Sequence, residues 1–130
     1  MSSDSRPPMK APAVTALIAN HNYGQWIADA IQSVVKQSYP VKQFCVIDDR
    51  STDDSVKRIV DLFDVVKEFS VTIDEREYDC INGSISGTPG FIIKNVYDDK
   101  KGPAAARNLG FRVIQAVSPT EVHAVLDADD

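Results

Sequence analysis

Several common signatures are missing from this sequence, and each absence removes a class of protein. No apolar run approaches the roughly 18 residues that a membrane-crossing helix needs. The first twelve residues are rich in Ser, Pro and charge and lack the apolar centre of a signal peptide. The net charge is -5 and no Lys/Arg cluster stands out, so the electrostatic footprint of a nucleic-acid-binding protein is absent. We therefore expect a cytoplasmic protein with no membrane segment and no nucleic-acid partner.

Cysteine and the usual nucleophile motifs are also scarce. The two cysteines, Cys45 and Cys80, do not have the spacing of a metal site. Reduced, intracellular thiols are the default for so few cysteines, although spacing alone leaves a disulfide between them open. No Ser/His/Asp or Cys/His arrangement, Gly-rich phosphate fingerprint or P-loop is present. A functional site has to be sought among other residues.

The length fits one domain and one short tail. A chain of 130 residues can bury a core without disulfides but is too short for two independent domains. A composition of 43% hydrophobic and 25% charged residues is typical of a soluble globular domain. Residues 1–12 are predicted to be a disordered tail, and residues 13–130 form the domain. The sequence stops on Asp127-Ala128-Asp129-Asp130 directly after an apolar run, so we expect the front part of something larger.

Hydrophobic periodicity switches repeatedly between strand and helix. Helical spacing is found over residues 27–35, over residues 56–63 and from Gly102-Pro103 to Val117. Short apolar or alternating runs predict strands at residues 14–19, 44–47, 69–73, 91–96 and 123–126. Residues 74–90, which contain three glycines and a proline, predict a long loop or a small hairpin. The first, second and last strands are continuously apolar, as strands covered on both faces are. The pattern predicts an α/β fold: a Rossmann-like, mostly parallel sheet with helices on both faces.

Polar side chains gather where these three apolar strands end, at residues 20–22, 48–49 and 127–130. Ligands of such sheets bind at the carboxyl ends of the strands. The carboxylates of Asp127, Asp129 and Asp130 are the oxygen ligands that Mg²⁺ or Mn²⁺ prefers, and such an ion would neutralise a diphosphate. Acidic residues also commonly end strands and begin turns, so both interpretations stand.

Other residues at this edge could contact a nucleotide. A carboxylate after the second strand, where Asp48 and Asp49 stand, can accept hydrogen bonds from a base or a ribose. Residues 51–53 are expected only to cap the next helix, with Ser51 or Thr52 as the cap itself. Arg107 follows a helix N-terminus, and both features suit a phosphate, but its position equally fits a solvated surface residue. His21, in the first strand-helix turn, is by itself more typical of a polar loop residue than of a ligand contact.

Five stretches of this sequence together resemble the N-terminal half of family 2 glycosyltransferases, which have the GT-A type fold. They are residues 14–22, 30–40, 46–53, 102–110 and 125–130. The resemblance covers the chain apart from the tail and the segment from about residue 63 to residue 101. Each motif is weak alone, and their common order and spacing make the resemblance specific.

The resemblance implies an inverting transfer of a sugar from a nucleotide-diphosphate donor, commonly a UDP-sugar, to an acceptor hydroxyl. Asp49 matches the carboxylate that reads the nucleobase, with Asp48 beside it. The turn formed by Ala19, Asn20 and His21 would lie against the base and the ribose.

The same resemblance implies a metal cofactor. Asp127 and Asp129 match the DxD motif that holds Mn²⁺ or Mg²⁺ on the diphosphate, Asp127 also lying against the donor, and Asp130 could share that work. Arg107 would lie near the nucleotide.

The sequence departs from the family pattern in two ways. Ala19 and His21 stand where the family often has Pro or Thr and then Tyr, which leaves the choice of nucleotide open. Family members also continue past the DxD motif, and their later half supplies most of the acceptor site and the general base. We therefore expect no catalytic residue before Asp130 and little or no activity from this chain alone, while the sugar and the acceptor stay open.

Two alternative functions remain at this point. The chain could be a non-catalytic module that binds a nucleotide. Residues 125–129 could also be the nucleophile motif of a haloacid-dehalogenase-like phosphatase fragment. That motif normally opens its domain, and this interpretation leaves Asp48, Asp49 and Gly102 unexplained.

Overall fold

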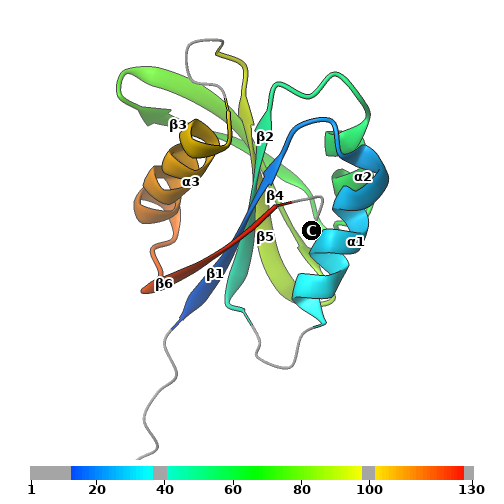
Figure 1. The fold of residues 1–130 in the computed structure, drawn as a ribbon. Helices are drawn as coiled ribbons and strands as arrows, with labels where there is room; N and C mark the ends of the chain where they lie inside the picture. Colours follow the sequence, from blue (N-terminus) through cyan, green and yellow to red (C-terminus); the bar gives the residue numbers. More distant parts are fainter. Residues whose placement is uncertain (1–12, 37–40, 98–101, 128–130) are drawn as a thin grey trace, which may run out of the picture.

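The computed structural model describes residues 13–36, 41–97 and 102–127 (Figure 1). The predicted tail, residues 1–12, and the last three residues, 128–130, lie outside the described residues. Along the described chain the elements are β1 (Val14–Asn20), α1 (Gly24–Val35), β2 (Gln43–Asp49), α2 (Ser55–Val60), β3 (Lys67–Ile73), β4 (Arg76–Ile85), β5 (Thr88–Asn95), α3 (Pro103–Val117) and β6 (Val122–Asp127).

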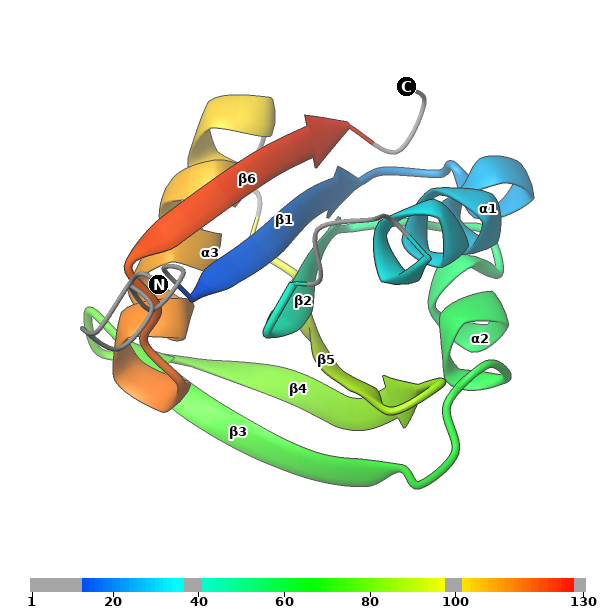
Figure 2. The ribbon, with the colours of Figure 1, turned by 90° about the horizontal axis from the view of Figure 1, so that it is seen from below.

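The strands form one six-stranded sheet in the order β3-β4-β5-β2-β1-β6. The four strands β5, β2, β1 and β6 are parallel to one another. On the other side of β5, β4 and then β3 pair in the antiparallel sense, and the sheet curves strongly (Figure 2). The predicted α/β fold with a mostly parallel sheet is confirmed.

Helices cover both faces of the sheet, with α1 and α2 on one side and α3 on the other (Figure 1). Alternate residues of the central strands point to opposite faces. Ile18 of β1 and Val46 of β2 pack in the core under α1 and α2, whereas Leu17 and Ile47 pack in the core under α3. This alternation continues to the ends of the strands, so the adjacent residues Asp48 and Asp49 face opposite sides of the sheet.

Of the two alternatives for residues 74–90, the hairpin is confirmed and the long loop is wrong. Most of them belong to two strands, the ten-residue β4 and the start of β5. A two-residue turn joins β3 to β4, since Ile73 pairs with Arg76. A second two-residue turn joins β4 to β5, since Ile85 pairs with Thr88. Of the three glycines that suggested a loop, Gly87 lies in the second turn, with φ 83°, whereas Gly83 and Gly90 lie inside strands because aromatic rings occupy the space above them. A Cβ on Gly90 would lie 2.1 Å from the ring of Phe44, and one on Gly83 would lie 2.4 Å from the ring of Phe63.

Two other expectations need correction. Helix α2 ends at Val60 instead of reaching Phe63, whose side chain nevertheless packs in the core. The last strand, β6, is apolar but is not covered on both faces by the described residues. It lies at an edge of the sheet, and Val122, Val125 and Leu126 are 41%, 41% and 37% exposed. Among the helices that the structure describes, none combines the length and the apolar character required to cross a membrane.

Candidate functional site

The carboxyl ends of the four parallel strands meet at one edge of the sheet, and polar residues stand at each end. Strand pairing places Asn20 of β1 beside Asp48 of β2, and Asp49 beside Asn95 of β5. The backbone of Asp127, the last residue of β6, aligns with Ala19. The structure therefore brings the predicted residues of three strands to one edge. It adds Asn95, which the sequence analysis did not select although it too ends a strand of this sheet.

On the face of α1 and α2, Asp48 holds the end of β1. Asp48 is 5% exposed, and its Oδ1 accepts a hydrogen bond from Asn20 Nδ2 at 2.8 Å. Its Oδ2 accepts a hydrogen bond from the backbone N–H of Ser51 at 3.2 Å. Asn20 is 1% exposed, and its Oδ1 is a buried acceptor with no hydrogen-bond partner among the described residues. Buried polar atoms are normally paired, so this oxygen is an exception to that rule.

The turns that follow β1 and β2 are tied together by Asn22 and Ser51. The Ser51 hydroxyl accepts hydrogen bonds from the Asn22 backbone N–H at 2.9 Å and from Asn20 Nδ2 at 3.2 Å. Asn22 Oδ1 accepts from the backbone N–H groups of Thr52 and Asp53 at 2.7 and 3.1 Å. Asn22 has φ 58°, a left-handed conformation that asparagine tolerates better than most residues. Sequence reasoning did not single out Asn22 as the residue that joins the two turns.

Asp53 holds the starts of both helices on this face. Its Oδ2 accepts a hydrogen bond from the backbone N–H of Gly24, the first residue of α1, at 3.0 Å. Its Oδ1 accepts from the Ser55 backbone N–H at 3.0 Å and from the Ser55 hydroxyl. Desolvation raises the pKa of the Asp53 carboxyl, but these hydrogen bonds outweigh it and hold that pKa below its ordinary value. The expectation that Ser51 or Thr52 caps α2 is wrong, because the Ser51 hydroxyl bonds to the first turn instead.

On the opposite face, Asp49 holds the start of α3. Asp49 is 6% exposed, and its Oδ2 accepts a hydrogen bond from the backbone N–H of Gly102 at 2.9 Å. Its Oδ1 accepts from Asn95 Nδ2 at 3.1 Å and lies 3.4 Å from Arg50 Nε. Gly102 immediately precedes α3, so the carboxylate lies at the positive end of that helix. A carboxylate has about four acceptor positions, and the contacts that the described residues make leave one of them open on Oδ2.

His21 and Arg107 belong to the two segments that Asp49 contacts, the turn after β1 and the helix α3. His21 Nδ1 lies 2.5 Å from the backbone carbonyl oxygen of Asp49, and because a carbonyl only accepts, Nδ1 carries the hydrogen. The exposed ring is thereby fixed, and its Nε2 is left to other partners. Arg107 is half-buried in the first turns of α3 and makes no hydrogen bond or ion pair within the described part of the chain.

Of the three predicted metal ligands, the structure describes only Asp127. The backbone of Asp127 ends β6 at the polar edge, but Asp129 and Asp130 lie outside the described residues. Among the described residues, no three His, Cys, Asp or Glu side chains come together as metal ligands would. The metal assignment therefore stays a prediction.

Comparison with known proteins agrees with this geometry. The sequence pattern of the family described as glycosyl transferase family 2 matches residues 15–79, which is half of the chain. The chain belongs to glycosyl transferase family 2. The match runs from β1 to the start of β4 and thus covers both polar turns on the α1 and α2 face.

A curated relative extends the similarity into the rest of the chain. An uncharacterized glycosyltransferase of Nostoc sp. (strain PCC 7120 / SAG 25.82 / UTEX 2576) is 28% identical over 117 residues. The aligned part is 90% of this chain but 28% of that relative, so the chain spans little more than a quarter of the relative's length.

Proposed function

We propose that the polar edge of this sheet binds the nucleotide-diphosphate sugar donor, with a UDP-sugar as the first candidate, of an inverting glycosyl transfer. The observation that carries the proposal is the convergence of Asn20, His21 and Asp49 at the carboxyl ends of β1 and β2 in a family 2 chain. Ligands of open α/β sheets bind at this edge. The sugar acceptor is left unassigned.

The nucleobase and ribose are assigned to the turn after β1, at residues 19–21. The exposed His21 ring is held by its bond to the Asp49 carbonyl, so a base can stack on it without ordering it first. Asn20 supports this turn from below, since it is 1% exposed and its Nδ2 donates to Asp48 and to Ser51. Asp48 serves this site by positioning Asn20, since both of its carboxylate oxygens are already engaged.

Asp49 and Arg107 are assigned to the nucleotide on the α3 side. The open acceptor position on Asp49 Oδ2 can take one N–H of the base while Asn95 and Gly102 keep the carboxylate in place. Arg107, half-buried in the first turns of α3, supplies a charge suited to phosphate. Because Asp48 and Asp49 are both engaged in hydrogen bonds, neither is assigned as the base that takes the acceptor proton.

The residues at the end of β6 suit a divalent ion in their chemistry. Asp127, Asp129 and Asp130 offer hard oxygen ligands, and β6 delivers the first of them to the edge, in register with Ala19. Mn²⁺ or Mg²⁺ held there would neutralise the charge of the diphosphate leaving group.

Calorimetric titration with UDP, in the presence and absence of Mn²⁺, tests the proposal. UDP should bind more tightly with Mn²⁺, and Asp129→Ala should remove that difference. Asp49→Asn and His21→Ala should each weaken UDP binding by about tenfold or more, as the loss of a hydrogen bond to a charged group or of a stacked base does. Asp29→Asn, which changes an exposed carboxylate on α1, is the matched control and should leave UDP binding unchanged.

Two results would contradict parts of the proposal. A UDP affinity that is the same with and without Mn²⁺, and is unchanged in Asp129→Ala, would contradict the metal assignment. It would favour a module that binds a nucleotide alone. No heat with UDP, ADP, GDP or TDP at millimolar concentrations would remove the donor site itself.

A further inference from the structure

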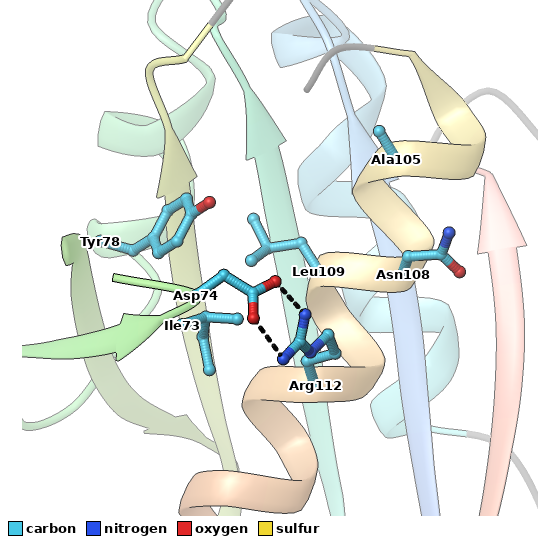
Figure 3. A pocket seen from close by; sticks show the side chains of 7 residues that line it. All are labelled: Ile73, Asp74, Tyr78, Ala105, Asn108, Leu109 and Arg112. Carbon is cyan, nitrogen blue, oxygen red and sulfur yellow. Dashed lines mark hydrogen bonds and ion pairs between the residues drawn. The ribbon is translucent and has the colours of Figure 1, made fainter. Parts of the chain in front are cut away.

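A pocket separate from the polar edge lies between α3 and the turn that joins β3 to β4. It has a volume of about 160 Å³ (Figure 3). Ile73, Tyr78 and Leu109 supply apolar walls, and Ala105 lies at the α3 side. Figure 3 shows the Tyr78 ring projecting from β4 toward α3 and Leu109 projecting from α3 toward the hairpin. None of these residues takes part in the proposed donor site.

The side of the pocket formed by the hairpin tip is closed by an ion pair. Arg112 of α3 contacts Asp74 through both Nη atoms, with Nη2 to Oδ1 at 2.8 Å and Nη1 to Oδ2 as the second bond. Asp74 and Glu75 form the two-residue turn and both have positive φ, 52° and 67°. Two positive φ values define a type I′ turn, which normally favours Asn-Gly. The bidentate pair thus fixes a turn whose sequence does not favour that conformation by itself.

The wall opposite α3 is also rigid. Tyr78 is 5% exposed and packs edge-on against Tyr97, with ring centroids 5.3 Å apart and an interplanar angle of 76°. Tyr97 is held in turn by its hydroxyl, which donates to the Glu77 carbonyl at 2.9 Å, and by Arg76, which lies 4.6 Å from its ring centroid. Only a small part of Tyr78 borders the pocket, and a ligand would meet a preformed wall that it does not have to order.

We propose that this pocket binds a small molecule carrying one aromatic ring, with a polar substituent at the open side. The size supports one ring, because an apolar protein cavity of about 150 Å³ accepts benzene. Aromatic character is favoured because the ring would lie against the exposed guanidinium of Arg112, which Asp74 holds in place. A saturated ring of equal size would gain only the apolar contacts.

The test follows backbone amide signals by NMR while phenol is added to the intact chain. Phenol should shift amides of the β3–β4 turn and of α3 with a dissociation constant on the order of 1 mM, typical of a ligand of seven heavy atoms. Cyclohexanol should bind at least several-fold more weakly at the same residues. UDP should not compete with phenol, so failure of either site can be recognised separately.

Neighbouring alanines on α3 provide a matched pair of variants. Ala105→Leu places its side chain in the pocket and should weaken phenol binding by about tenfold or more by filling the volume. Ala104→Leu adds the same atoms at an exposed position and should leave phenol binding unchanged. Both keep a residue of high helix propensity, so α3 should persist.

A second variant changes the size of the pocket. Ile73→Ala enlarges it, and 2-naphthol should then bind more tightly than phenol, reversing the preference of the original chain. The proposal is overturned if phenol shifts only the exposed residues of β6, if cyclohexanol binds as well as phenol, or if Ala105→Leu and Ile73→Ala both leave binding unaltered.

Discussion

The two carboxylates that end β2 are neighbours in sequence but organise opposite faces of the sheet. Asp48 belongs to a network on the α1 and α2 face that joins Asn20, Ser51 and the turns after β1 and β2. Asp49 belongs to a network on the α3 face that joins Asn95 of β5 to the start of α3. The side chains of these two adjacent residues therefore stabilise different parts of the structure.

The two networks differ in the polar groups that they leave without a hydrogen-bond partner among the described residues. Both oxygens of Asp48 are engaged with the protein, and the network on its face is closed except for Asn20 Oδ1. On the α3 face, Asp49 keeps an acceptor position, and the exposed His21 ring is held by the Asp49 backbone. The first network therefore chiefly stabilises the fold, whereas the second also borders the proposed donor site, and single substitutions can remove each of them separately.

Asp48→Ala should have the largest effect on stability. It removes two hydrogen bonds to a buried carboxylate and leaves Asn20 Nδ2 with only the Ser51 hydroxyl as acceptor, which should cost about 3 kcal/mol in the free energy of unfolding. Urea denaturation followed by circular dichroism measures this loss. Asp29→Ala, at an exposed position of α1, should change stability little. A loss for Asp48→Ala no larger than for Asp29→Ala would show that the network does not hold the two turns.

Asn95→Ala should weaken the other face by a smaller amount. It removes the bond from Nδ2 to Asp49 and the bond that Oδ1 accepts from the Tyr97 backbone N–H, which should cost about 2 kcal/mol. Because Asp49 then loses one of the groups that orient it, UDP affinity should fall as well. Parallel urea denaturation and UDP titration check both effects. A stability loss with unchanged UDP binding would separate the α3 network from the donor site.

Sequence patterns predicted the parallel half of the sheet better than the antiparallel half. The continuously apolar strands β1 and β2 and the helical spacing of α1 and α3 are strong signals, and all four elements exist close to the expected bounds. The strand β4 was expected only as part of a loop or a small hairpin, because its glycine is equally typical of a loop residue. Gly83 accepts the Phe63 ring, which is a tertiary contact that no local pattern contains. The Asp74-Glu75 turn gave no signal either, since its conformation depends on Arg112 of a distant helix.

The candidate site was predictable in its position but not in its hydrogen bonding. Strand ends in a parallel sheet share an edge, so Asn20, His21 and Asp49 could be grouped from sequence. The opposite orientation of Asp48 and Asp49 follows from strand alternation and could have been derived as well. The contact of Asp49 with Gly102 spans 53 positions and depends on how α3 docks. Long-range docking of this kind cannot be deduced from local spacing.

Asp53→Asn tests the α1 and α2 face through pH. Hydrogen bonds to the carboxylate keep the folded-state pKa below the unfolded value of about 3.9. The carboxylate therefore contributes stability above about pH 4, and this contribution is lost as the pH falls through the folded-state pKa. At pH 6 the variant should be less stable by about 1 kcal/mol, as for loss of a helix cap, and the difference should shrink toward pH 3. A difference that does not depend on pH would assign the effect to geometry instead of charge.

The labelling rate of the two buried cysteines should report how firmly α3 packs on the sheet. Of the predicted effects, this one is expected to be the smallest. Cys45 and Cys80 are free thiols in the core beneath α3, so no disulfide joins them. Burial, with a further contribution from Asp79, raises the pKa of Cys80 to about 11. At pH 8 only about one Cys80 thiol in a thousand would then be ionised, and labelling by a disulfide reagent should be slow until the protein opens.

The cysteines also distinguish the two networks when global stability is matched. With urea adjusted so that both variants have the same free energy of unfolding, Asn95→Ala should label a few-fold faster than Asp53→Asn, because only the former loosens α3 locally. Equal labelling rates would mean that the thiols become accessible only through global unfolding. In that case the Asp49 network would not hold α3 independently, and the two faces of the edge would act as one cooperative unit.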